Sequence, residues 1–100
     1  MAGEREQYLI GLLVKALDAY ERGDGGLARL VVDVESGIEA LFDVAEREWV
    51  EQLRSAWSGL EIVYALALDD GRSALTEEER GDVDETIAEL RSLLAAQASN

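Results

Sequence analysis

The sequence predicts an all-α fold: a four-helix, bundle-like single domain over residues 1–100, with antiparallel hairpins and a long central third helix. Apolar residues recur every three or four positions through most of the chain, which is the spacing of one helix face. Proline is absent, which favours long uninterrupted helices. Apolar residues make up 48% of the chain and charged residues 31%, as in globular rather than disordered proteins.

The first helix is expected over residues 4–22 and the second over residues 25–42. Gly23 is suited to the left-handed position that ends a helix, and Asp24 is expected to cap the helix that follows. So short a connector predicts an antiparallel hairpin. The apolar face of the first helix comprises Tyr8, Leu9, Leu12, Leu13, Ala16, Leu17 and Tyr20.

The chain is expected to break between the second and third helices. Val31 to Val34 could form a short strand, but the helical spacing continues beyond it and favours a helix. The next apolar stripe resumes at Val50, two residues out of phase, which is a rotation of about 200°. One straight helix cannot bury both stripes, so a break is predicted near residues 43–46, where Asp43 and Glu46 have the spacing of a capping box.

The third helix is expected over residues 45–70 and the fourth over residues 77–97. Residues 62–68 are apolar all round, which predicts contact with neighbouring helices on several sides. Thr76 and Glu79 have the spacing of a capping box for the fourth helix. Gly81, in its first turns, weakens that helix by about 1 kcal/mol relative to alanine.

The net charge of -13 is concentrated in residues 33–51 and 77–89, each of which holds seven acidic residues and one basic residue. Such self-repulsion opposes folding, so it requires an explanation in solubility or in a partner. Glu77 to Glu79 have an ordinary one, because anions are favourable at a helix N-terminus. The acidic ridge of the fourth helix is explained about equally well by solubility and by a partner.

Several function classes are not expected. The chain has neither histidine nor cysteine, and the acids lie away from the apolar stripes that would raise a carboxyl pKa, so we expect no enzyme, metal or cofactor. There is no basic stripe for nucleic acid. The longest apolar run has seven residues, far short of the ~20 needed to span a membrane. The polar first six residues are unlike a signal peptide, which favours a cytoplasmic protein.

The second helix carries the candidate partner-binding surface. Glu35, Glu39 and Asp43 follow one another at four-residue spacing, where like charges repel, and they lie toward the helix end that disfavours anions. The exposed apolar Val32 is expected beside them, a combination that suits a basic partner. The alternative is a solvated face with a cap at Asp43. The predicted surface comprises Val32, Glu35, Glu39, Asp43, Glu46 and Trp49. The other aromatic residues are expected mostly in the core.

The chain resembles small acidic helical immunity proteins of bacteria, particularly the colicin D type family. The resemblance covers most of the chain in length and helix order. It lies in residues 20–23 (YERG), 27–31 (LARLV), 48–49 (EW), 57–61 (WSGLE) and 64–69 (YALALD). It implies a substrate mimic whose carboxylates occupy the basic cleft where a nuclease toxin would hold RNA phosphates.

These observations lead to two hypotheses. The first is an immunity or antitoxin-type inhibitor that binds a basic toxin, a candidate nuclease, through the acidic 33–51 surface. The alternative is a homo-oligomeric helical adaptor or structural protein without catalysis, in which the charge only maintains solubility and the chain associates with itself.

Overall fold

The computed structural model of the chain describes residues 3–72 and 74–98. Four helices are present: α1 (Glu4–Glu21), α2 (Leu27–Leu41), α3 (Arg47–Asp69) and α4 (Glu77–Ala98). The predicted all-α, four-helix fold is confirmed, and the helix ends lie within one or two residues of those predicted. Met1 and Ala2, which belong to the polar stretch considered above, lie outside the described residues.

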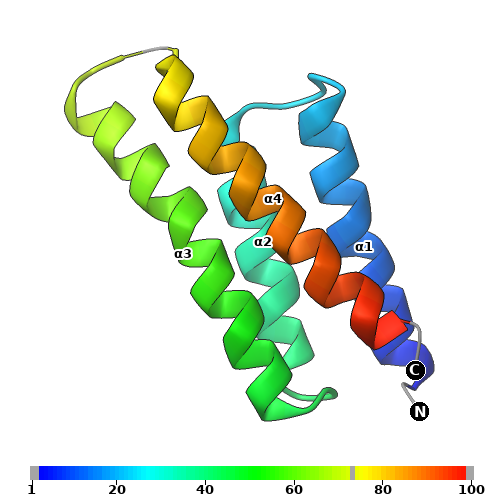
Figure 1. The fold of residues 1–100 in the computed structure, drawn as a ribbon. Coiled ribbons are helices and arrows are strands. Elements are labelled where there is room, and N and C mark those ends of the chain that lie inside the picture. Colours follow the sequence, from blue (N-terminus) through cyan, green and yellow to red (C-terminus); the bar gives the residue numbers. More distant parts are fainter. Residues whose placement is uncertain (1–2, 73, 99–100) are drawn as a thin grey trace.

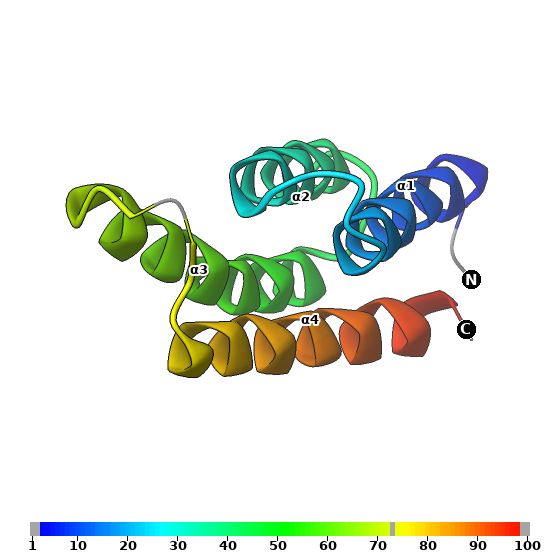
Figure 2. The same cartoon turned by 90° about the horizontal axis from the view of Figure 1, so that it is seen from above.

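The helices form an elongated bundle with principal extents of 43 × 24 × 18 Å. Each helix packs against the next along the chain, and α4 also contacts α1 (Figure 1). Seen from above, α1 and α2 form one layer and α3 and α4 the other (Figure 2). The seam between α1 and α4 is bridged by polar side chains: Arg91 donates to Asp18 at 2.8 Å and to Glu21, and Gln97 donates to the buried Glu6 at 3.0 Å.

The core contains apolar side chains from all four helices, including Leu17, Ile38, Leu53 and Leu90, each of which is almost completely buried. Two tryptophans on α3 connect that helix to its neighbours. The indole N–H of Trp57 donates to the carbonyl oxygen of Val31 on α2 at 3.0 Å. That of Trp49 donates to the carbonyl oxygen of Leu93 on α4, also at 3.0 Å. Each indole therefore buries its ring with its one donor satisfied.

Glycines in the left-handed conformation end α1 and α3. Gly23 has φ = 82°, as predicted, and its N–H donates to Tyr20 while that of Asp24 donates to Ala19, a Schellman motif. Gly71, with φ = 64°, ends α3 through the same pair of bonds.

The predicted helix starts are partly confirmed. Thr76 and Glu79 form the expected capping box on α4: the Glu79 N–H donates to the Thr76 hydroxyl at 3.1 Å, and the Thr76 N–H donates to the Glu79 carboxylate at 2.9 Å. The predicted cap by Asp24 is wrong, because two glycines separate it from α2 and it pairs with Arg22 instead. The capping box of Asp43 and Glu46 is also wrong: the chain does break there, but Glu46 itself precedes α3 and no side chain caps the helix.

Some apolar residues expected in the core lie at the surface. The second half of α3 is not covered on all sides, because α2 and α4 contact only its inner face. Ile62, Leu66 and Leu68 are consequently more than half exposed. Tyr8 is 61% exposed although it belongs to the predicted stripe of α1, and Phe42 also lies at the surface. Within residues 3–72 and 74–98, no helix combines the length and apolar character needed to cross a membrane.

Candidate partner-binding surface

Four acidic residues of α2 and of the turn after it form one row on the outside of the bundle, which we call the acidic row: Glu35, Glu39, Asp43 and Glu46. Glu39 and Asp43 are exposed, and Glu35 is half-buried. Val32, one turn before Glu35, is 58% exposed. Val32 and Glu39 are separated by two turns, so their side chains leave the same side of α2, and Asp43 follows in the turn after the helix. The sequence prediction of an exposed valine beside a line of carboxylates therefore agrees with the structure.

These carboxylates lack the partners that neighbouring acids have. Asp33, just before the row, pairs with Arg29 at 3.5 Å, and Glu51, just after it, pairs with Arg47 at 3.2 Å. For Glu35, Glu39, Asp43 and Glu46, no ion pair is found among the described residues. The chain itself accounts for this, because residues 30–46 include five acidic residues and no basic residue.

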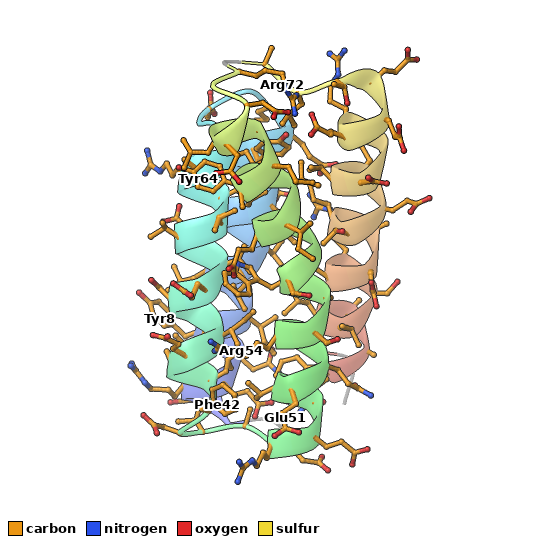
Figure 3. The ribbon with its side chains drawn as sticks, turned by 90° about the vertical axis from the view of Figure 1, so that its left-hand side faces the viewer. Tyr8, Phe42, Glu51, Arg54, Tyr64 and Arg72 are labelled. Carbon is orange, nitrogen blue, oxygen red and sulfur yellow. The ribbon has the colours of Figure 1, made fainter. Side chains whose placement is uncertain are left out.

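A second cation of α3, besides Arg47, also contacts a residue outside the row. The guanidinium of Arg54 lies over the ring of Trp57, 5.8 Å from its centroid, which is within the range of a cation–π contact. Figure 3 shows Arg54 reaching from α3 toward α2, with Phe42 at the end of α2. The charge of the acidic row is thus left for solvent or for another molecule to compensate.

Trp49 does not belong to this surface. The sequence predicts it as part of this surface, but it is 8% exposed and its indole N–H donates to the carbonyl oxygen of Leu93 within the bundle. Its position on α3 faces α4 rather than α2, so it stabilises the fold from within. Glu46 is exposed at the turn between α2 and α3, as a surface residue should be.

Two apolar residues beside the row escaped the sequence prediction. Phe42 is 37% exposed at the end of α2, and Val44 is 41% exposed in the turn that follows. Phe42 directly follows the stripe residue Leu41, so periodicity alone suggested burial. The signal that distinguishes them is the end of α2 at Leu41, beyond which the chain leaves the core.

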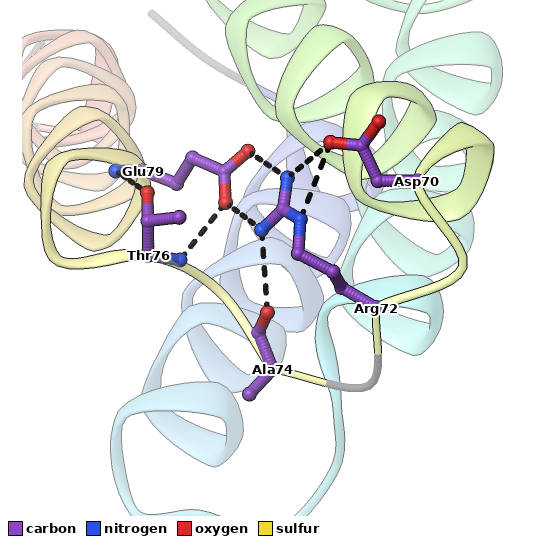
Figure 4. A network of polar contacts seen from close by, with 5 residues as sticks. All are labelled: Asp70, Arg72, Ala74, Thr76 and Glu79. Atoms are coloured by element: carbon purple, nitrogen blue, oxygen red, sulfur yellow. Dashed lines mark hydrogen bonds and ion pairs between the residues drawn. The ribbon is translucent and has the colours of Figure 1, made fainter.

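The second acidic stretch, in contrast, contains a carboxylate with a structural role. Glu79 receives two bonds from the guanidinium of Arg72, at 2.5 and 2.8 Å, in addition to its capping bond (Figure 4). The guanidinium of Arg72 also donates hydrogen bonds to the carboxylate of Asp70 and to the carbonyl oxygen of Ala74. The hydrogen bonds from Arg72, followed by that from the Thr76 backbone, lower the pKa of Glu79 from 4.5 to about 2. This network holds the connection between α3 and α4.

Four other acids of α4 form an exposed ridge, for which no ion pair is found in the described part of the chain: Glu78, Asp82, Glu85 and Glu89. Among the α4 residues whose exposure is described, no large apolar residue is exposed beside this ridge. The α2 row differs from it in having Val32, Phe42 and Val44 next to the carboxylates. Among described residues, no three acidic side chains converge closely enough to hold a metal ion.

Comparison of the chain with models of protein families, with curated proteins and with solved structures gives no match. The resemblance to colicin D type immunity proteins therefore stays an expectation from sequence.

Proposed function

We propose that this chain is an immunity-type inhibitor that binds a basic protein, a nuclease toxin, in the bacterial cytoplasm. Its binding surface is the α2 row of Val32, Glu35, Glu39, Asp43 and Glu46, extended by Phe42 and Val44. The protein acts without catalysis, by covering the basic cleft where the nuclease would hold phosphates. The observation that carries the proposal is the line of carboxylates that no described cation pairs with, beside an exposed valine.

The energetics of α2 favour this interpretation over solubility alone. Like charges four residues apart destabilise a helix by about 0.2–0.5 kcal/mol per pair, and anions near a helix C-terminus are unfavourable as well. The last turn of α2 has no basic residue to offset them. Acidic residues at helix N-termini would maintain solubility equally well, and there they would stabilise the helix. A docking surface explains why the destabilising positions are used.

The test is charge reversal with a matched control. One variant combines Glu35→Lys, Glu39→Lys and Asp43→Lys; the control combines Asp82→Lys, Glu85→Lys and Glu89→Lys on the α4 ridge. Both change the net charge equally and both alter surface side chains. The α2 variant is expected to fold at least as stably as the original chain. The three lysines still repel one another, but they reduce the net negative charge and place cations at the favourable helix end.

The functional measurement is affinity capture from cells that naturally produce the chain, followed by a nuclease assay on the captured protein. The original chain and the α4 control should capture and inhibit a basic nuclease, whereas the α2 variant should do neither. Added salt should slow association markedly, since steering between opposite charges is screened. Equal inhibition by both variants would refute the assignment of the surface.

One observation favours the adaptor function as a second candidate. Ile62 and Leu66, one turn apart on α3, expose apolar surface beside each other. In a homo-oligomeric adaptor this face would be buried between copies. Light scattering across protein concentrations decides the matter: an adaptor shows a mass that rises with concentration and returns to the monomer when Leu66 is changed to serine.

A further inference from the structure

A groove with a volume of about 430 Å³ runs between α1 and α2. Its floor is apolar, formed by Leu9, Leu13 and Ala16 of α1 together with Gly37 of α2. Leu12 lines the α1 side and is 42% exposed, so part of its side chain has no intramolecular cover. The α1 residues that line the groove extend from Leu9 to Ala19, a length of about 15 Å, or nearly three helical turns. These dimensions suit one short helix.

The two walls of the groove differ in charge. Ser36 lines the α2 wall and lies one turn from both Val32 and Glu39, so these two residues of the α2 row lie beside the edge of the groove. On the same wall Arg29 is paired with Asp33, so Arg29 does not neutralise the carboxylates of the acidic row. On the α1 wall, Lys15 is exposed and has no ion pair among the described residues.

We infer that the groove between α1 and α2 binds an amphipathic helix of the partner protein, with its apolar stripe on the groove floor and its basic flank against the acidic row of α2. This inference rests on the proposed function and specifies the partner segment. A helix laid in an apolar groove uses anchors at i, i+3 or i+4, and i+7, which three turns of α1 accommodate. Lys15 fixes the orientation, because a basic flank facing α1 would meet this cation instead of the carboxylates.

The experiment uses the full chain and a synthetic helical peptide of about four turns, with leucine every three or four residues and lysine along one flank. Binding is followed by fluorescence anisotropy at physiological ionic strength. One comparison peptide carries glutamate in place of the lysines, and a second carries serine in place of the leucines. The basic amphipathic peptide should bind at least about tenfold more tightly than either comparison peptide.

Two surface variants locate the site. Leu12→Ser should weaken the basic amphipathic peptide by about tenfold, the usual loss on truncating an anchor contact. Leu66→Ser, on α3, removes a leucine that is 53% exposed and should leave the affinity unchanged, since Leu66 does not line the groove. Amide shifts in NMR spectra of the original chain should change on peptide addition at Leu12, Ser36 and Gly37. Equal loss in both variants, or shift changes confined to other helices, would overturn the inference.

A second copy of the chain is the competing occupant. Its net charge of -13 opposes approach to the acidic wall, so self-association through the groove is not expected. Light scattering of the chain alone tests this: a dimer that is lost in Leu12→Ser would overturn the inference in favour of a second copy.

The groove and the inhibitor function can fail separately. If Leu12→Ser weakens the peptide but no nuclease is captured or inhibited, the groove inference stands and the inhibitor function falls. If a nuclease is inhibited and only the α2 charge-reversal variant abolishes the inhibition, while Leu12→Ser affects neither nuclease nor peptide, the function stands and the groove inference is overturned.

Discussion

The close approach of α1 and α2 at Gly37 gives a prediction whose sign is opposite to the ordinary rule for glycine in a helix. Alanine is normally better than glycine inside a helix by about 1 kcal/mol. A methyl group at Gly37, however, would lie 2.5 Å from Cδ2 and 2.8 Å from Cγ of Leu13. Leu13 is buried against the core. The substitution therefore requires α1 and α2 to move apart or the leucine to leave its rotamer.

The magnitude follows from the two opposing terms. Overpacking a core by a methyl group costs about 1–3 kcal/mol, and the helix propensity of alanine returns about 1 kcal/mol. Gly37→Ala should therefore reduce the free energy of unfolding by up to about 2 kcal/mol. At Gly81 a methyl group meets no atom within 4 Å, so Gly81→Ala should gain the propensity term in full. In a domain of this size 1 kcal/mol corresponds to about 4–8 °C in Tm.

The assay is urea unfolding followed by circular dichroism and by tryptophan fluorescence, with Gly11→Ala as a second control at an open position. The order of stability should be Gly81→Ala and Gly11→Ala above the original chain and Gly37→Ala below it. Stabilisation of Gly37→Ala by as much as the controls would show that α1 and α2 are farther apart at this point than the structure has them.

Three further predictions concern polar contacts and the exposed face of α3. The ionised carboxylate of Glu79, whose pKa is lowered to about 2, stabilises the fold fully above about pH 4.5 and loses this effect as the pH falls toward 2. The difference in stability between the original chain and Glu79→Gln should therefore be largest at neutral pH. In acid titrations it should vanish near pH 2. A pH-independent difference would contradict the Arg72 contact. Trp57→Phe removes the bond to Val31 and should lower the free energy of unfolding by about 1–2 kcal/mol in urea; a change below 0.5 kcal/mol would indicate that this bond is absent. Ile62→Ser, at a position 58% exposed, should change the stability by less than about 0.5 kcal/mol, and a larger loss would show that another element covers α3.

Local sequence signals predicted the helices well because they act over a few residues. The three- and four-residue spacing fixed the four helices, and Gly23 and the Thr76–Glu79 pair act through bonds within one turn of the chain. Contacts between helices were less predictable. The exposure of Ile62 depends on how many helices cover α3, and Gly37 is significant only because Leu13 packs against it. Neither fact has a signature in the residues nearby.

The candidate site likewise has parts that local sequence signals predicted and parts that depend on contacts between helices. The exposure of Val32 and Glu39 followed from the helical period of α2, since that period places them opposite the buried stripe. Trp49 was misplaced because it lies near the edge of the α3 stripe, where a small rotation separates the surface from the contact with α4. The groove was not predicted although the pairing of α1 with α2 was, because a groove depends on which side chains leave the space between the two helices unfilled.

The two acidic stretches show why net charge by itself is poor evidence for a partner. Residues 33–51 and 77–89 have the same count of acids and bases, yet their carboxylates lie in different surroundings. Three acids of the second stretch lie in the first turn of α4, where they stabilise the helix, and one of them holds Arg72. Those of the α2 row lie toward a helix end that repels them, without a described counter-ion. The informative quantity is thus the balance of charge around each carboxylate. This balance is unfavourable along the α2 row, which is why we place the partner-binding surface there.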